Sequence, residues 1–229
     1  SCYKLRNHIM STVPKLYYWG MPGRAEYIRL AFHAGGVEFE NIAVTGPSYG
    51  ELKASLSATV PQINLPMLEV NGQHFVESKA ILRYAGAMGG LIPSDPLQQL
   101  KMDEAICMTE DVFGAVFATF SIKDEAEKLA ARKALSGPEG KLTAVLKKFD
   151  AYLSGCTTAF ICGDELSIAD IAVFCVMGNM VAGFLDGLDL DMLKDYAGIQ
   201  AMRKKVATHA KVASRYENET EGPLFNGFK

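Results

Sequence analysis

The chain has 229 residues and a formal net charge of −3 at pH 7; 49% of its residues are hydrophobic and 21% are charged. This composition excludes a disordered chain and predicts globular domains with well-filled cores. The slightly acidic balance argues against nucleic acid as a partner, and we expect none.

The cysteines predict reduced thiols in a cytoplasmic protein. There are five of them, an odd number, and no two have Cys-x-x-Cys spacing: Cys2, Cys107, Cys156, Cys162 and Cys175. The four histidines are scattered, so we expect no metal site. The longest apolar stretch, residues 168–185, contains Asp170 and Asn179. It predicts a buried helix rather than a membrane span, and we expect no membrane partner.

Residues 1–14 form an N-terminal extension outside the expected fold. No apolar run follows Lys4 and Arg6, so this segment lacks the pattern of a signal peptide. Met10 is a candidate natural start, which would make residues 1–9 extraneous to the protein. We therefore expect the fold to begin at residue 15.

Residues 15–90 alternate between strand and helix patterns and predict an α/β domain. The expected strands cover residues 16–19, 39–44, 67–70 and 73–76, and the expected helices cover residues 24–34 and 78–88. Residues 48–58 have a weaker helical pattern and predict either a helix or an ordered loop. Asn71-Gly72, between the last two strands, is a strong hairpin signal. The order βαβαββα predicts a four-stranded mixed sheet with helices on both faces. It resembles the thioredoxin-like fold, in which a proline, usually cis, stands where Pro66 is.

Residues 91–96 predict a linker, and residues 97–229 predict an all-helical second domain. Helical patterns cover residues 97–120, 124–135, 140–153, 167–185 and 198–206, with shorter pieces near residues 189–196 and 208–217. Ser167 and Asp170 predict a capping box at the start of one of these helices, with Leu166 and Ile171 as its hydrophobic staple. This signal concerns stability rather than chemistry.

Three short motifs in the first domain carry the functional signal. Asn64-Leu65-Pro66 leads into a strand, where the Leu65 backbone is able to pair with a peptide-shaped ligand. Ser78 opens a helix, so its hydroxyl and the helix N-terminus suit a carboxylate. Tyr17-Tyr18-Trp19 places a phenol near the end of the first strand, within reach of a thiol. Together the motifs resemble those of a cytosolic glutathione transferase of the mu and sigma classes, over nearly the whole chain from about residue 15.

The resemblance implies that glutathione is a co-substrate, with no tightly bound cofactor, and that the enzyme must stabilise its thiolate. A free thiol has a pKa of about 8.5, and lowering it by about two units requires about 2.7 kcal/mol of preferential interaction with the anion. One hydrogen bond from a phenol in a partly closed site is of this size.

Tyr17 and Tyr18 point to opposite faces of the strand, so only one of them is able to make this bond. In the mu and sigma pattern the catalytic tyrosine is followed by an aromatic residue and, six residues on, by an arginine. Trp19 and Arg24 fit that register and select Tyr18. The resemblance implies that Trp19 lies beside the ligand and that Arg24 braces the tyrosine region electrostatically.

The resemblance also implies which residues bind the cysteinyl and γ-glutamyl parts of glutathione. Leu65, beside Pro66, would pair its backbone with the cysteinyl residue, and Asn64 matches an asparagine of the mu pattern. Ser78 would take the γ-glutamyl carboxylate, and Glu77 the ammonium.

The glycine end of glutathione is where the sequence departs from the family pattern. Mu and sigma enzymes usually have a tryptophan and a lysine in the loop before Asn64, but Trp19 is the only tryptophan here. Lys53, the sole lysine or arginine between Arg29 and Lys79, is the candidate by default. The alternatives are Tyr49 and Gln62.

An acid in the second domain is expected to complete the site across a homodimer. Family members use a carboxylate on the first helix of this domain to reach the glutathione amine bound to the other subunit. Asp111 lies eight residues after Asp103, as in the mu pattern. A solvated helix carboxylate is the alternative interpretation.

The candidates for binding a hydrophobic electrophile are Met21, Cys107, Phe113, Phe117 and Phe225. Phe113, Phe117 and Phe120 have i, i+4, i+7 spacing, which is more often typical of core than of a pocket. The resemblance leaves three functions open. Conjugation of glutathione to electrophiles leads, and isomerisation of the prostaglandin D synthase type is the second. The third is a non-catalytic role, either as a binding or structural protein of the lens-crystallin kind or as a domain in an elongation-factor complex. The retained Tyr18 and Ser78 count against the last.

Overall fold

The computed structural model describes residues 12–60, 62–217 and 223–228. Most of the expected N-terminal extension, including Cys2 and Met10, lies outside these residues. The chain divides into two compact units, residues 1–92 and 93–229. No helix of the described residues is long and apolar enough to cross a membrane.

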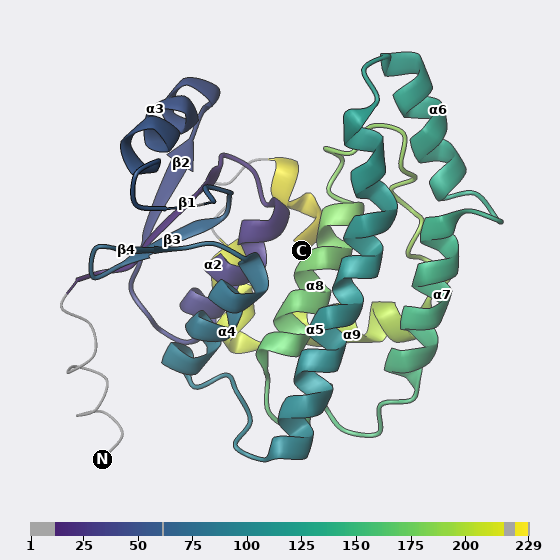
Figure 1. Cartoon of the computed structure of the whole chain (residues 1–229). Helices are drawn as coiled ribbons and strands as arrows, with labels where there is room; N and C mark the ends of the chain where they lie inside the picture. The colour runs from purple at the N-terminus through teal and green to yellow at the C-terminus, as the bar shows by residue number, and fades with distance from the viewer. Residues whose placement is uncertain (1–11, 61, 218–222, 229) are drawn as a thin grey trace. The chain divides into compact units, whose positions relative to one another are not determined.

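The first unit contains a four-stranded mixed sheet with the strand order β2-β1-β3-β4 (Figure 1). The strands are β1 (Lys15–Trp19), β2 (Glu40–Val44), β3 (Met67–Val70) and β4 (Gln73–Phe75). β2 runs parallel to β1, whereas β3 pairs antiparallel with both β1 and β4. Asn71 and Gly72 join β3 to β4, with φ of 51° and 75°. Two consecutive positive φ angles are what a tight hairpin turn requires, so the predicted hairpin is confirmed.

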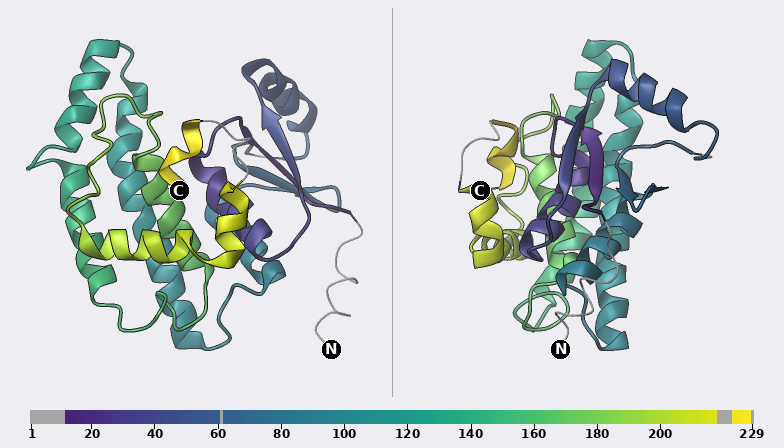
Figure 2. Two further views of the ribbon diagram at one scale, coloured as in Figure 1. Left: turned by 180° about the vertical axis from the view of Figure 1, so that it is seen from behind. Right: turned by 90° about the vertical axis from the view of Figure 1, so that its left-hand side faces the viewer.

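Two of the helices in this unit lie side by side (Figures 1 and 2): α2 (Glu26–Ala34), which follows the short η1 (Gly23–Ala25), and α4 (Ser78–Gly89). They approach so closely at Gly35 and Gly89 that a Cβ on either glycine would collide with the other residue's Cα. α3 (Gly46–Leu56) buries no residue. Its weak helical pattern in the sequence reflects this exposure.

The second unit is helical and is built around α8 (Ile168–Met180), all of whose residues are buried. The other helices are α5 (Pro96–Phe117), η2 (Ala118–Ser121), α6 (Glu125–Leu135), α7 (Lys141–Ser154), α9 (Ala197–Ala207), α10 (Ala210–Tyr216) and η4 (Pro223–Phe228). Seen from behind in Figure 2, α9 is drawn in front of the bundle. Together with the mixed sheet of the first unit, this confirms the predicted fold class.

The capping box at the start of α8 is confirmed. Asp170 accepts hydrogen bonds from the Ser167 backbone N–H at 2.9 Å and from its hydroxyl at 2.7 Å, and a third from the Ile161 N–H at 2.9 Å. Leu166 and Ile171, the two staple residues, are both buried. Burial of the Asp170 carboxyl outweighs these hydrogen bonds and raises its pKa above the ordinary value.

Two predicted helical segments are shorter or absent. α8 ends at Met180 rather than continuing to residue 185, and Gly183 and Gly187 adopt φ of 85° and 93°, outside the helical region. Residues 189–196 form turns instead of a helical piece. The apolar pattern continued past Met180 because residues such as Leu185 and Leu188 remain buried without being helical.

The C-terminal segment η4 is packed onto α8. Phe228 is buried, with its ring 5.7 Å from that of Tyr216 and 6.2 Å from that of Phe174. A Cβ at Gly178 would lie 2.8 Å from the Phe228 ring, so this glycine makes room for it. Arg203 also donates to the Gly227 carbonyl at 2.7 Å, which fixes the segment from a second helix.

Candidate active site

The predicted glutathione-binding segments of the first unit meet at one end of its sheet. In the β1–β3 pairing Tyr17 lies opposite Met67, so continuing the register places Pro66 opposite Tyr18. β2 is parallel to β1 and leads into α3 at this end, while β4 pairs antiparallel with β3 and leads into α4 here. Leu65-Pro66 is a cis peptide bond, as predicted.

Tyr18 is held by the turn that follows β1. Its phenol oxygen accepts a hydrogen bond from the Arg24 backbone N–H at 3.0 Å. Burial raises the pKa of Tyr18 above its ordinary value of 10.0, although this hydrogen bond and the charges of Arg24 and Arg29 oppose the shift. The phenol therefore keeps its proton at neutral pH. Because the Tyr18 oxygen already accepts from the backbone, this proton remains available for a second partner.

Gly23 makes this arrangement sterically possible. Its φ is 46°, in the left-handed region. A Cβ at this position would lie 2.5 Å from the Tyr18 phenol oxygen. Only glycine therefore allows the turn to pass over the tyrosine ring.

A buried ion pair that the sequence analysis missed braces the same turn. Arg29 is only 4% exposed, and its guanidinium lies 3.2 Å from the Glu26 carboxylate and 5.7 Å from the centre of the Tyr18 ring. It also donates to Asn41 Oδ1 and to the backbone carbonyls of Trp19, Met21 and Pro22. The Arg29 side chain and the Arg24 backbone thus hold this turn, and the charge of Arg24 acts on the Tyr18 phenol together with that of Arg29. The electrostatic brace by Arg24 stays a prediction. The sequence signal for this ion pair is that Glu26 and Arg29 are charged residues three positions apart among the apolar residues of an expected helix.

Tyr17 lies on the other face of the sheet, as the strand pattern predicted. Burial alternates along β1, with Tyr18 buried and Tyr17 only partly so. The Tyr17 hydroxyl donates to Glu69 at 2.7 Å. Burial and this carboxylate raise the pKa of Tyr17 to about 12. Its proton is thereby committed to Glu69 rather than to a ligand.

Ser78 lies at the start of α4. Its oxygen accepts a hydrogen bond from the Tyr27 hydroxyl at 2.6 Å. Glu77, the preceding residue, has a φ of 75°, and its exposed side chain makes no capping bond to the helix. The N-terminus of this 12-residue helix and the Ser78 hydroxyl together suit an anion.

An aromatic and basic cluster joins β1 to α3. The Trp19 and Tyr49 rings meet edge to face with centres 5.2 Å apart, and Lys53 Nζ lies 5.0 Å from the centre of the Tyr49 ring. The Tyr49 hydroxyl donates to the Ile63 carbonyl at 2.8 Å, in the segment that leads to the exposed Asn64. The structure therefore places one glycine-end candidate, Tyr49, against Trp19 and a second, Lys53, against Tyr49, whereas Gln62 is an exposed loop residue.

The remaining predicted residues are spread over the two units. Met21 is half-buried in the first unit. On α5, Cys107 and Asp111 are exposed and Phe113 is half-buried. Phe117 and Phe120 are 64% and 55% exposed with ring centres 5.8 Å apart, so the interpretation of these two as core is wrong. Phe225 is half-buried, with its ring 5.9 Å from that of Phe228.

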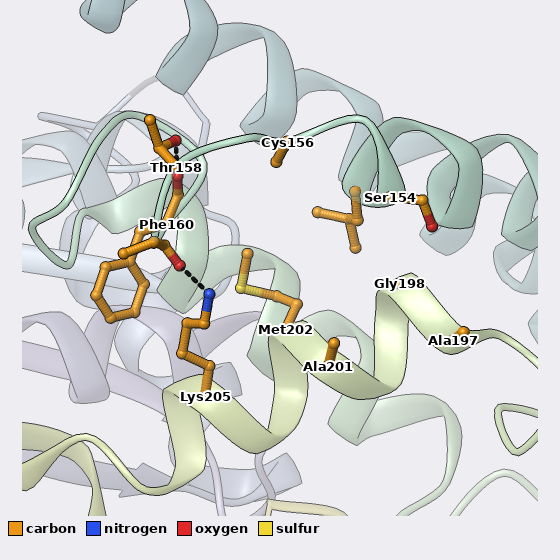
Figure 3. Close-up of a pocket in the computed structure, with 11 residues that line it drawn as sticks. Ser154, Cys156, Thr158, Phe160, Ala197, Gly198, Ala201, Met202 and Lys205 are labelled. Atoms are coloured by element: carbon orange, nitrogen blue, oxygen red, sulfur yellow. Dashed lines mark hydrogen bonds between the residues drawn. The ribbon is translucent and has the colours of Figure 1, made fainter.

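A separate pocket of about 350 Å³ lies within the helical unit (Figure 3). It is lined by the end of α7, the loop after it and α9, with Cys156, Phe160, Met202 and Lys205 among its residues. Lys205 closes one side by donating to the Ala159 carbonyl. None of the predicted site residues lines this pocket.

Comparisons with known proteins match both units. A family model described as "Glutathione S-transferase, N-terminal domain" matches residues 14–86, and one described as "Glutathione S-transferase, C-terminal domain" matches residues 110–219. Together they cover most of the chain.

Individual relatives match over most of their length. Glutathione S-transferase 3 of Caenorhabditis elegans is 29% identical over 80% of this chain and 87% of its own. S-crystallin SL11 of Nototodarus sloanii is 25% identical over 87% of this chain and 93% of its own. The structure of prostaglandin synthase D of Nilaparvata lugens is 25% identical, with a TM-score of 0.75 over 90% of this chain and 98% of that one. With the sheet, the cis Leu65-Pro66 bond and the tyrosine turn, these matches show that the chain belongs to the glutathione S-transferase family.

Proposed function

We propose that this protein is a glutathione transferase in which the Tyr18 hydroxyl donates a hydrogen bond to the thiolate of glutathione. The observation that carries this assignment is the Tyr18 phenol, fixed by the Arg24 N–H at the sheet end where Leu65-Pro66 and Ser78 also lie. The phenol stays protonated at neutral pH because burial raises its pKa. The Tyr18 hydroxyl is therefore able to donate a hydrogen bond to the thiolate at neutral pH.

Glutathione is bound along this sheet end as a dissociable co-substrate. Leu65 pairs its backbone with the cysteinyl residue, beside Pro66, and Asn64 borders it. Ser78 and the N-terminus of α4 hold the γ-glutamyl carboxylate, with Glu77 near the ammonium. Lys53, supported by the Tyr49 ring beside Trp19, takes the glycine carboxylate.

The reaction joins the sulfur of glutathione to an electrophilic atom of a hydrophobic molecule. The thiolate supplies the electron pair of the new bond, and the leaving group departs with the electrons of the broken one. The Tyr18 hydrogen bond contributes by favouring the thiolate over the thiol. Met21, Cys107, Phe113, Phe117 and Phe225 remain the candidates for contacting the electrophile.

Three further properties belong to the same proposal. The enzyme is of a mu- or sigma-like class, since Trp19 and Arg24 follow Tyr18 in that register. It works as a homodimer in which Asp111 of one subunit reaches the glutathione amine in the other. It acts in the cytoplasm.

Retention on glutathione-agarose, followed by an assay with chlorodinitrobenzene, tests the proposed function. We expect retention and conjugation in the wild type, retention without efficient conjugation in Tyr18→Phe, and full activity in the matched Tyr17→Phe variant. Absence of binding by the wild type would contradict the assignment. Binding without any conjugation would instead favour a non-catalytic role.

Isomerisation of the prostaglandin D synthase type is the second candidate, favoured by the similarity in fold to a prostaglandin synthase D. In that reaction the thiolate opens an endoperoxide and is released again. A panel of electrophiles assayed beside a prostaglandin endoperoxide separates the two activities. Consumption of glutathione indicates conjugation, whereas turnover with glutathione conserved indicates isomerisation.

A further inference from the structure

A second buried tyrosine contacts Ser78, the residue proposed to hold the γ-glutamyl carboxylate of glutathione. Tyr27, on α2, is 1% exposed, and its hydroxyl donates to the Ser78 oxygen at 2.6 Å. Ser78 is itself 7% exposed. The two residues are 51 positions apart in the sequence, so the bond links the first helix of the unit to the N-terminus of α4.

The direction of this hydrogen bond matters for Ser78. A serine hydroxyl has one proton to donate and two lone pairs with which to accept. The bond from Tyr27 occupies a lone pair, and it is the one side-chain hydrogen bond of Ser78 within the described residues. The Ser78 proton is therefore left for an acceptor outside this unit's own side chains, and a carboxylate at the N-terminus of α4 is such an acceptor.

Tyr18 shows the same arrangement at the thiol end. There, too, a fixed donor occupies a lone pair of the hydroxyl oxygen and leaves its proton for the ligand. The two hydroxyl groups predicted to contact glutathione thus each accept a hydrogen bond from another residue of the protein.

We propose that Tyr27 is a positioning residue for glutathione binding: it orients the Ser78 hydroxyl so that the serine proton points at the γ-glutamyl carboxylate. This inference rests on the proposed function, because it requires glutathione in this site. In this role the Tyr27 hydroxyl acts through Ser78, so it contributes to affinity for one group of the ligand and not to thiolate formation.

Tyr27→Phe tests the inference, because it removes the hydroxyl and keeps the ring. Titration calorimetry with glutathione should show affinity weakened by about fivefold, the effect of one hydrogen bond. The Michaelis constant for glutathione should rise similarly, while kcat and the pH–rate profile stay as in the wild type. Tyr17→Phe, which removes a hydroxyl from the other face of the sheet, is the matched control and should bind normally.

Two further measurements separate this role from general stabilisation of the fold. In a Ser78→Ala background, Tyr27→Phe should weaken binding no further, because its effect passes through the serine hydroxyl. With 4-aminobutyryl-cysteinyl-glycine, a glutathione analogue that lacks only the γ-glutamyl carboxylate, wild type and Tyr27→Phe should bind equally. A merely structural change would weaken the binding of both ligands.

The outcomes distinguish the inference from the proposed function. Wild-type protein that binds no glutathione would overturn both. Glutathione binding that is equal in wild type and Tyr27→Phe, additive losses in the double variant, or an equal loss for the analogue would overturn the role of Tyr27 alone. Far-ultraviolet circular dichroism of each variant checks that the fold is retained.

Discussion

The Arg24 backbone N–H donates to the phenol oxygen of Tyr18 at 3.0 Å, so the catalytic candidate is oriented by the main chain rather than by a side chain. The bond depends on the path of the turn, which Arg29 fixes through the carbonyls of residues 19, 21 and 22. The chemistry of the site is therefore sensitive to the turn as well as to the residues that contact substrate.

Tyr18→Phe should lower turnover at neutral pH by about one to two orders of magnitude, because one hydrogen bond to an anion is lost. Glutathione affinity should stay nearly intact. The pH–rate profile should move upward by about one to two units, since the thiol then ionises at higher pH. Steady-state kinetics between pH 6 and pH 9 check both effects. If Tyr17→Phe is the damaging change instead, the choice of Tyr18 as the catalytic tyrosine is wrong.

Ser78→Ala should raise the Michaelis constant for glutathione more than it lowers kcat. In the proposed function the hydroxyl contacts a part of glutathione that does not react, so it would bind ground state and transition state alike. Kinetics with varied glutathione, together with calorimetry, measure the split. An unchanged dissociation constant would remove Ser78 from the site.

Arg29→Met should destabilise the first unit by about 3 kcal/mol or more, because it deprives the fully buried Glu26 carboxylate of its cation. Urea unfolding measures the loss. Adding Glu26→Leu to Arg29→Met should recover part of the lost stability, because neither charge of the Glu26–Arg29 ion pair then remains buried. Arg24→Ala is the control: Arg24 contacts Tyr18 through its backbone, so the hydrogen bond should persist. A cost for Arg29→Met no larger than that for Arg24→Ala would contradict the bracing role.

Asp111→Asn should remain a dimer by light scattering and yet bind glutathione about tenfold more weakly, the effect of one charge-assisted hydrogen bond. The side chain is exposed on α5, so its replacement should not affect the fold. Glu110→Gln, about 100° around the helix, should do less. A fully active monomer, or equal affinities for wild type and Asp111→Asn, would exclude a site shared between subunits.

The stability advantage of wild type over Asp170→Asn should shrink as the pH rises. Burial raises the pKa of Asp170 above 3.8, so the folded protein binds this proton more tightly than the unfolded chain does. The contribution of the group to stability is therefore full below the unfolded pKa and declines as the pH rises through the folded pKa. Urea unfolding of both proteins from pH 4 to pH 7 checks the trend; a growing difference would contradict it.

Local signals in the sequence were sufficient for several features. The Asn71-Gly72 turn and the Ser167–Asp170 capping box each depend on backbone angles and hydrogen bonds between near neighbours, and both were predicted. The cis bond at Pro66 was predicted from family resemblance. Features that depend on distant packing were not predicted. The hydrogen-bond partners of Arg29 include residues that precede it in the sequence and one that follows it, Asn41. The Tyr27–Ser78 hydrogen bond joins residues 51 positions apart.

Exposure was also beyond what spacing alone could predict. Phe117 and Phe120 follow a core-like spacing, yet α5 ends at Phe117 and the two rings are exposed. Lys53 was chosen by elimination, and only the fold shows that Tyr49 joins it to Trp19. In each case the sequence identifies the residue, but its neighbours in space come from elements that are distant in the sequence and so could not be predicted.

A substitution at Gly23 would act on the turn that holds the Tyr18 hydroxyl. Any side chain at this position would press on the Tyr18 hydroxyl and strain a left-handed turn. A lineage that kept the protein for bulk properties, such as solubility, would be free to lose this glycine. If Tyr18 has the proposed role, the identity of residue 23 offers a marker for separating active from inactive relatives that all retain the tyrosine.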